Sequence, residues 1–150
     1  MTYTIVPFEP VLVDTNVLLY AFDTTQGQKH TISKDFLVQR LKQQQEVILS
    51  NQNLVEFLSV TTKNKMDYKR ASALIYTIVQ SRYVRVIRSS ISDIASASVH
   101  AGQLRMSYWD ALLAETMFEN NVFTICTEDE GFRNDRRLNV INPFKKRCKN

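Results

Sequence analysis

Four carboxylates, those of Asp14, Glu56, Asp110 and Asp129, follow or interrupt apolar segments of this chain. Asp14 closes the apolar run 11–13, and Asp129 lies just beyond the run 124–127. An acidic residue at the carboxyl end of a buried strand points into the crevice where open α/β sheets bind ligands. If all four converge, their repulsion requires a cation, and hard oxygen ligands suit Mg²⁺ or Mn²⁺. The pattern therefore indicates a metal-dependent site for phosphodiester cleavage, with all four acids as metal ligands.

The first two acids each have a plain structural alternative. Asp14 could cap a helix that begins near Asn16, because an Asp side chain accepts hydrogen bonds from the first free backbone N–H groups. Glu56 lies within an apolar helix and could sit half-exposed at the edge of its buried stripe. In the functional interpretation, Glu56 borders the core and needs a partner, since uncompensated burial of a charge is costly.

The last two acids are open to the same question. Asp110 follows Ser107 at a spacing close to that of a capping box, and an acid in the first helical turn complements the helix dipole. Asp129 is the middle one of three consecutive acids before Gly131, which is typical of a solvated turn. In the functional interpretation, Asp129 turns toward the site, the Thr127 hydroxyl supports it, and the two neighbouring glutamates face water.

The elements that must position these acids alternate along the chain. Short apolar runs predict strands at 11–13, 47–49, 83–87, 122–127 and 138–141. Helical spacing predicts helices over 16–22, 31–44, 51 onward, 68–81, 90–104 and 109–119. Strands separated by helices need crossover connections, so we expect a three-layer α/β/α sandwich with a mainly parallel central sheet, formed by residues 1–150 as a single domain. One edge of such a sheet can bring Asp14 and Asp129 together.

Apolar spacing also predicts which helical side chains face the core. For the helix that begins near residue 51, with Asn51 as its cap, the expected inward residues are Leu54, Val55, Leu58 and Val60. For 68–81 they are Ala71, Leu74, Ile75 and Ile78, and for 90–104 they are Ile91, Ile94, Ala95 and Val99. Tyr108 and Trp109, beside a helix start, are expected to pack in the core, with stacking of either on a base as the alternative.

Composition and charge narrow the class of protein. The chain has 150 residues, 44% of them hydrophobic, with no uninterrupted apolar run near the ~20 residues that cross a bilayer. We expect no membrane association, no signal peptide, a cytoplasmic location and two reduced cysteines, Cys126 and Cys148. The net charge is +4, and the segment between Glu56 and Asp110 is strongly basic, whereas acids gather from 110 to 135. This distribution suits a polyanion held near metal ions, with solvated helix faces as the alternative.

Taken together, the acidic segments resemble those of a known family. The segments 11–20, 51–57, 108–114 and 127–132 resemble, in order, the four acidic motifs of the PIN-domain nucleases, and 140–144 resembles the closing strand of that family. The resemblance covers nearly the whole chain. The length of the chain is most similar to that of the VapC toxins of bacterial toxin–antitoxin pairs.

The resemblance implies a ribonuclease that uses one or two Mg²⁺ or Mn²⁺ ions held by the four acids, with water as the nucleophile. Asn16 and Thr127 would orient carboxylates or water. The implied partners are the RNA substrate, a small antitoxin protein and a second copy of the chain in a homodimer. Two other functions stay open: a PIN nuclease of RNA maturation or of DNA, and a non-catalytic RNA- or protein-binding module.

Overall fold

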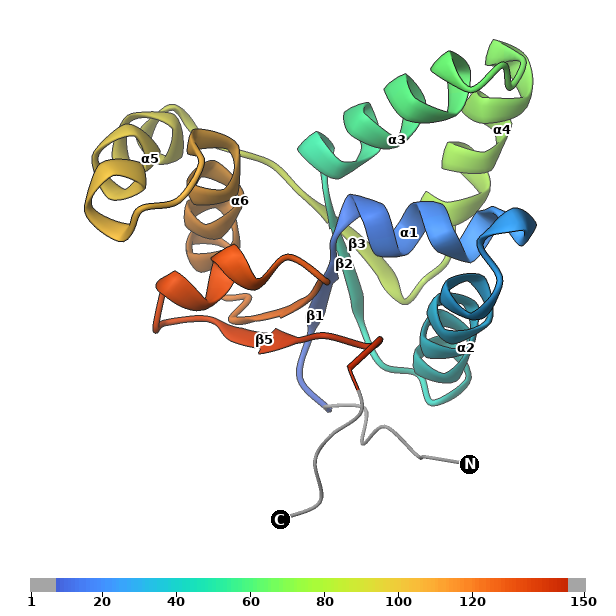
Figure 1. Cartoon of the computed structure of the whole chain (residues 1–150), viewed down its shortest axis with the longest axis horizontal. Coiled ribbons are helices and arrows are strands. Elements are labelled where there is room, and N and C mark those ends of the chain that lie inside the picture. Colours follow the sequence, from blue (N-terminus) through green and yellow to red (C-terminus); the bar gives the residue numbers. More distant parts are fainter. Residues whose placement is uncertain (1–7, 146–150) are drawn as a thin grey trace.

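A five-stranded sheet organises the computed structural model, which describes residues 8–145 (Figure 1). Its strands are β1 (Val11–Val13), β2 (Val47–Ser50), β3 (Val84–Ile87), β4 (Thr124–Cys126) and β5 (Asn139–Ile141), in the spatial order β3-β2-β1-β4-β5. Every neighbouring pair is parallel, and the register places Leu12 of β1 opposite Ile48 and Ile125. The expected α/β class with a parallel sheet is confirmed.

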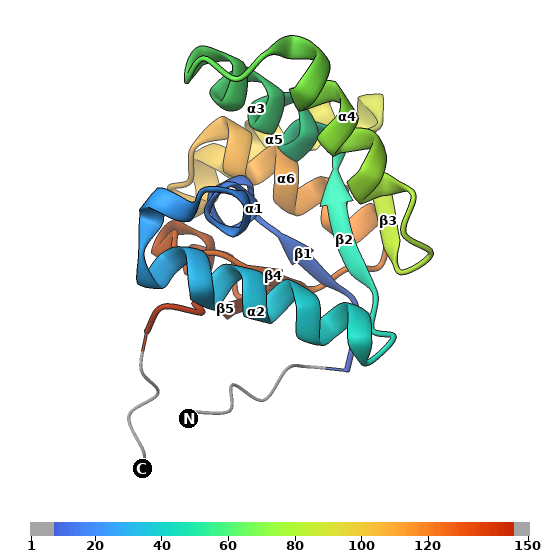
Figure 2. The same cartoon turned by 90° about the vertical axis from the view of Figure 1, so that its right-hand side faces the viewer.

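Helices cover both faces of this sheet (Figures 1 and 2). One face carries α1 (Thr15–Phe22), α2 (Gln28–Lys42), α3 (Asn51–Lys63) and α4 (Tyr68–Val79). The other carries α5 (Ile91–Leu104) and α6 (Tyr108–Glu119). Two short 3₁₀ helices, η1 (Thr24–Gln26) and η2 (Glu130–Asn134), were not predicted from the sequence. The three-layer architecture agrees with the expectation.

Alternation along the strands explains the two main cores. Successive side chains of a strand point to opposite faces of the sheet. Leu12, in the middle of β1, therefore packs on the side of α6, whereas its neighbours Val11 and Val13 pack on the side of α1 to α4. Because all three are fully buried, both faces of the central strand are covered, as a parallel sheet requires.

The buried face of α3 differs from the predicted one. The predicted cap was Asn51, but Ser50 caps the helix, and its partner in a capping box is Asn53. Of the predicted inward residues, Leu54 packs against the core and Leu58 is partly buried, but Val55 is 66% exposed and Val60 is also exposed. The fully buried residues of the helix are Asn53, Phe57 and Thr61. Apolar spacing failed because the buried polar groups are satisfied: the Thr61 hydroxyl donates to the Phe57 carbonyl at 2.8 Å, and Asn53 closes the cap.

The predicted core stripe of α5 is wrong in a similar way. Ile91 is 87% exposed, and Ile94, Ala95 and Val99 also face solvent. Asp93 and Ala97 are buried instead. Asp93 accepts a hydrogen bond from the Ser90 backbone N–H at 2.7 Å and completes a capping box, so the start of the helix turns this acid inward.

Trp109 does not pack in the core, as was predicted, because its side chain is 61% exposed. By contrast, the predicted inward residues of α4 are confirmed: Ala71 is buried, and Leu74, Ile75 and Ile78 pack against the core beside α1. Cys126 is a buried free cysteine, as expected, and Cys148 lies outside the described residues. None of the helices within 8–145 combines the length and apolar character needed to cross a membrane.

Candidate active site

The strand order reverses between β1 and β4, and this point carries the first acid. From β1 the chain crosses to β2 and β3 on one side, then returns to β4 and β5 on the other. Such a reversal opens a crevice at the carboxyl ends of the strands. Asp14 follows β1 directly, and its backbone N–H donates to the Cys126 carbonyl of β4 at 3.0 Å. Thr127 follows β4 at the same edge of the sheet.

Both oxygens of Asp14 are anchored. Oδ1 accepts a hydrogen bond from the Thr15 backbone N–H at 2.8 Å, so Asp14 is indeed the cap of α1. Oδ2 accepts one from the Thr127 hydroxyl at 2.7 Å. Burial raises the pKa of Asp14 to about 6; the Thr127 and Thr15 hydrogen bonds oppose this rise, and the negative charges of Glu56 and Asp110 add to it. Capping and a site role are therefore compatible in this residue.

Two threonines link Asp14 to the segments that carry Glu56 and Asp129. The Thr15 hydroxyl donates to Glu56 Oε2 at 2.6 Å and accepts from Asn53 Nδ2 at 3.1 Å. The Thr127 hydroxyl, which donates to Asp14, accepts from the Asp129 backbone N–H at 3.0 Å. Thr127 was predicted from the sequence to orient a carboxylate of the site, but Thr15 and Asn53 were not. The available signal was that Asn53 lies three residues after Ser50, the spacing of the capping box that holds it inside the structure.

Glu56 and Asp110 face the crevice from opposite helices. Glu56 is half-buried on α3, where Gln52 Nε2 donates to its Oε1 at 3.2 Å. The same Gln52 nitrogen lies 3.4 Å from the Trp109 carbonyl, at the start of α6. The Asp110 backbone N–H donates to the Ser107 hydroxyl at 3.1 Å, so Ser107 caps α6. Burial raises the pKa of Asp110, and among its charged neighbours Asp129 and Glu56 raise it further.

Asp129 is exposed and shapes the turn after β4. Its Oδ1 accepts a hydrogen bond from the Gly131 backbone N–H at 2.8 Å and so caps η2. A Cβ atom at position 131 would lie 3.0 Å from that oxygen, so a larger residue there would push the Asp129 carboxylate away. The alternative of a solvated turn therefore describes the backbone correctly, while the charge of Asp129 still acts on Asp110.

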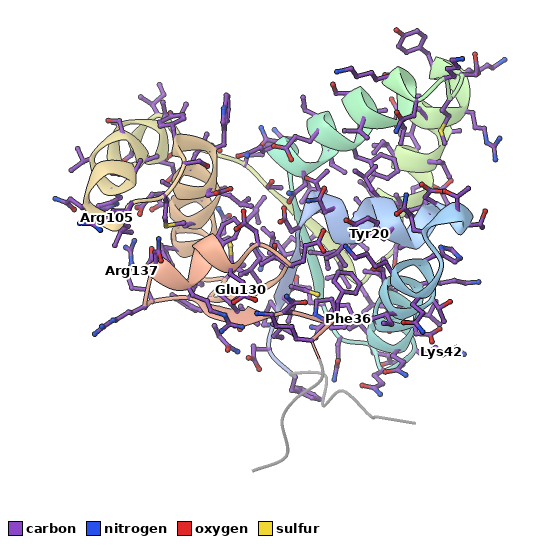
Figure 3. The ribbon with its side chains drawn as sticks, in the orientation of Figure 1. Tyr20, Phe36, Lys42, Arg105, Glu130 and Arg137 are labelled. Atoms are coloured by element: carbon purple, nitrogen blue, oxygen red, sulfur yellow. The ribbon has the colours of Figure 1, made fainter. Side chains whose placement is uncertain are left out.

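The two glutamates beside Asp129 do not simply face water, contrary to the prediction. Glu128 accepts hydrogen bonds from the Tyr20 hydroxyl at 2.5 Å and from Lys29 Nζ at 2.7 Å. Lys29 Nζ also lies 4.8 Å from the centre of the Tyr20 ring, whose edge meets Phe144. We call Tyr20, Lys29 and Glu128 the Glu128 latch; it ties the turn after β4 to α1 and α2, on the side where Figure 3 labels Tyr20.

Glu130, the second of these glutamates, pairs with cations on both sides. It lies 2.9 Å from Lys145 Nζ and 2.5 Å from Arg133 Nε. The hydrogen bond from Lys145 lowers the pKa of Glu130 most, followed by that from Arg133, to about 2. Its charge is therefore balanced outside the crevice.

The four acids lie near one another at the carboxyl edge of the sheet but do not form a closed metal cage. Within residues 8–145, no three His, Cys, Asp or Glu side chains lie close enough together to hold an ion. Hydrogen bonds through Thr15 link Asp14 to Glu56, and those through the Thr127 hydroxyl link Asp14 to the backbone of Asp129. Asp110 is coupled by charge repulsion to Asp14, Glu56 and Asp129. In the same part of the chain no Lys, Arg or His pairs with any of the four. Their negative charge is therefore uncompensated by the protein.

Asn16, the other predicted supporting residue, lies away from this network. Its side chain is exposed on α1, and no hydrogen bond links it to another residue of the described chain. It lies in the first turn of α1, two residues after Asp14. A role in orienting water or substrate stays a prediction.

A second group of acids, near η2 and α6, is compensated. Asp135 is only 2% exposed, and Arg137 lies 2.7 Å from its Oδ2 and 3.0 Å from Glu115 Oε1. His100 Nδ1 is 2.6 Å from the same Glu115 oxygen. Burial raises the pKa of Asp135, but hydrogen bonds and charge from Arg137 outweigh it, so the pKa lies below its usual value. Figure 3 shows Arg137 and Tyr20 on opposite sides of the sheet.

An apolar pocket of about 510 Å³ opens elsewhere, between α1, α2 and α4. Leu37, Leu41, Leu49 and Ile78 are among its lining residues, and His30 and Lys34 bring polar groups to it. None of the four acids lines it. Its chemistry suits an apolar group, so it is separate from the acidic crevice.

A family model for the PIN domain matches residues 11–137, which include all four acids. The chain belongs to the PIN-domain family. The matched segment begins at β1 and ends before β5, so it contains every element that contributes to the crevice. No curated protein sequence matches the chain. Membership of this family supports a nuclease activity for the acidic crevice.

Solved structures share this PIN fold at low sequence identity. VapC20 from Mycobacterium tuberculosis, a toxin that cleaves the sarcin–ricin loop, is 21% identical, with a TM-score of 0.60 over 82% of this chain and 92% of its own. VapBC2 from Rickettsia felis, bound to a DNA fragment from its promoter, is 16% identical, with a TM-score of 0.66 over 89% of this chain and 98% of its own. A toxin–antitoxin complex from Klebsiella pneumoniae is 19% identical, with a TM-score of 0.64 over 91% of this chain and 99% of its own. At such identities, the likeness establishes the fold of this PIN domain.

Proposed function

We propose that this PIN domain is a Mg²⁺- or Mn²⁺-dependent endoribonuclease and the toxin of a toxin–antitoxin pair. The observation that carries the proposal is the uncompensated charge of Asp14, Glu56, Asp110 and Asp129 around one crevice at the strand-order reversal. Burial disfavours the charged forms of Asp14 and Asp110, so these carboxylates are costly without a counter-charge. A divalent cation with carboxylate ligands would remove that cost.

The donor set fits such an ion. All four side chains offer hard oxygen ligands, and Asp14 is held in place by Thr15 and Thr127. Holding one ion jointly requires Glu56, Asp110 and Asp129 to turn toward Asp14, because the four side chains do not reach ligating distance in this structure. When bound, the ion supplies Lewis-acid activation of water and neutralises charge on the phosphate. The hydrogen bonds from Thr15 and Thr127 would keep Asp14 oriented during this change.

Cleavage of RNA is the direct test. Single-stranded and looped RNA would be incubated with Mg²⁺, Mn²⁺ or a chelator, beside the variants Asp14→Asn and Asp129→Asn and a single-stranded DNA of the same sequence. We expect cleavage only with metal, and a loss of at least about 100-fold in Asp14→Asn, more than removal of a supporting group produces. Equal cleavage by the wild type and both variants would refute the assignment of the site. Cleavage of DNA alone would refute the substrate.

Structures with related folds support the partner part of the proposal, since two of them are toxin–antitoxin assemblies. Expression of the wild-type chain in a bacterial host should arrest growth, whereas Asp14→Asn should not. Co-expression of a small protein encoded next to the gene should restore growth and co-purify with the chain. The homodimer is tested by light scattering of the purified chain. Growth unaffected by the wild type would argue for a housekeeping nuclease.

A further inference from the structure

The turn between α3 and α4 is a concentrated basic surface. Residues 63–70, which we call the hairpin tip, contain Lys63, Lys65, Lys69 and Arg70, all exposed, and a single acid, Asp67. Asp67 is occupied as the cap of α4, where its carboxylate accepts the Arg70 backbone N–H at 3.1 Å. Throughout the described chain, none of the four cations forms an ion pair. Their charge is available to a polyanion.

An exposed aromatic side chain stands among these cations. Tyr68 is the first residue of α4 and is 79% exposed. The neighbouring side chains Lys69 and Arg70 are exposed as well, so the Tyr68 ring lies on the surface among cations and not in the core. Cations that hold phosphates beside an open aromatic ring that stacks on bases form the usual combination for binding single-stranded nucleic acid.

The hairpin tip continues the wall of the acidic crevice. Glu56, Ser59, Val60 and Lys63 are spaced i, i+3, i+4 and i+7, so they lie along one face of α3. Seven residues of helix place Lys63 about 10 Å farther along α3 than Glu56. Figure 1 shows α3 rising from the carboxyl edge of the sheet to its junction with α4. A strand of RNA with one phosphate at the crevice can therefore follow this face to the cations.

A negatively charged site that acts on RNA needs positive charge nearby to bind its substrate. The four carboxylates of the crevice repel RNA phosphates, so affinity for the parts of the substrate away from the cleaved bond must come from cations elsewhere. We propose that the hairpin tip is a single-stranded RNA-binding surface that holds the part of the substrate flanking the cleaved bond. This inference rests on the proposed ribonuclease function and specifies how its substrate is held.

The test measures binding separately from cleavage. The full chain in chelator would be titrated against a labelled single-stranded 20-nucleotide RNA by fluorescence anisotropy, at several salt concentrations. One variant combines Lys65→Gln, Lys69→Gln and Arg70→Gln. The matched control combines Lys34→Gln, Lys42→Gln and Arg136→Gln, three exposed cations on other elements that also form no ion pair within the described chain. A third variant is Tyr68→Ala.

Each variant has its own expected result. The tip triple variant should lower affinity by about tenfold or more and reduce the slope of log affinity against log salt by about 2, because each lost phosphate contact on a single strand contributes about 0.7. The control should leave the slope unchanged. Tyr68→Ala should weaken binding by about fivefold or more at an unchanged slope, since stacking does not release counterions. With metal, the tip variants should raise KM while kcat stays near the wild-type value.

Two outcomes would overturn the inference. One is equal affinity and salt slope for the tip triple variant and its control. The other is a change of molecular mass in solution, from dimer to monomer, with RNA affinity unchanged, because the tip would then be a contact between copies of the chain. Absence of cleavage by the wild type would refute the proposed nuclease instead. Thermal melts of each variant check that these exposed substitutions leave the fold intact.

Discussion

Two groups of acids in this molecule are treated in opposite ways. Around Asp135, the protein supplies its own cation: Arg137 contacts both Asp135 and Glu115, and the pKa of Asp135 falls below its usual value. Around Asp14, the protein supplies only hydroxyl and amide donors, and the pKa rises to about 6. The first arrangement joins a loop to α6 and stabilises the fold. The second keeps charge uncompensated, which is what a site for an external cation requires.

The largest expected difference lies in how stability depends on pH. The pKa of Asp14 rises on folding from 3.8 to about 6, so the folded chain retains a proton that the unfolded chain releases between these values. In chelator, the contribution of Asp14 to the free energy of unfolding should therefore fall as pH rises from 4 to 6, by at most about 3 kcal/mol. Urea denaturation across this range should show the fall in the wild type and not in Asp14→Asn.

Adding Mn²⁺ should reverse this loss above pH 6, because an ion that binds only the folded chain stabilises it by mass action. Asp14→Asn should not respond. An unchanged melting temperature of the wild type in Mn²⁺ would place Asp14 with the structural acids and remove the contrast between the two groups.

The compensated group should respond mainly in stability. Arg137→Met leaves Asp135, which is 2% exposed, without its counter-charge, and should lower the free energy of unfolding at pH 7 by about 2 kcal/mol. Arg133→Met is the matched control, because its partner Glu130 is far more exposed than Asp135 and also pairs with Lys145, so the loss should be clearly smaller. Equal losses in the two variants, measured by urea denaturation, would show that the Asp135 pair is not a structural anchor.

The support of Asp14 should have a smaller effect, seen in the reaction. Thr127→Val removes the hydroxyl that donates to Asp14 and accepts from the Asp129 backbone. Cleavage should fall by about tenfold, and the acid limb of its pH profile should move to higher pH, because that hydrogen bond lowers the pKa of Asp14. The matched control is Thr124→Val, at the other end of β4, because the Thr124 hydroxyl donates to Glu9 and not to Asp14. This variant should leave the acid limb of the pH profile in place. Identical profiles would exclude this role for Thr127.

The smallest effect should come from the Glu128 latch. Lys29→Met removes an ion pair with a half-exposed lysine, so cleavage should fall by less than about fivefold. Lys34→Met, on the same helix and without an ion pair in the described chain, should have no effect. If cleavage fell as far as in Thr127→Val, the ion pair of Lys29 with Glu128 would be as important for the position of Asp129 as the Thr127 hydroxyl.

The sheet and the order of its helices could be predicted because the strands are apolar and separated by amphipathic segments. That Asp14 and Asp129 belong to one edge of the sheet followed from parallel pairing alone. The buried faces of α3 and α5 could not be predicted, because Asn53 and Asp93 are polar residues that capping boxes turn inward. Thr15 escaped notice because its partners, Asn53 and Glu56, are 38 and 41 positions away and meet it only in the folded chain.

The parallel pairing of β1 with β4 has a consequence during synthesis. It brings Asp14 beside Thr127, 113 positions later in the chain. A nascent polypeptide that ends before β4 lacks Thr127 and Asp129, and its β1 has no neighbouring strand on one side. For the proposed nuclease, incomplete translation products would therefore be inert. Its site would be complete only after β4 and the turn that carries Asp129 had left the ribosome.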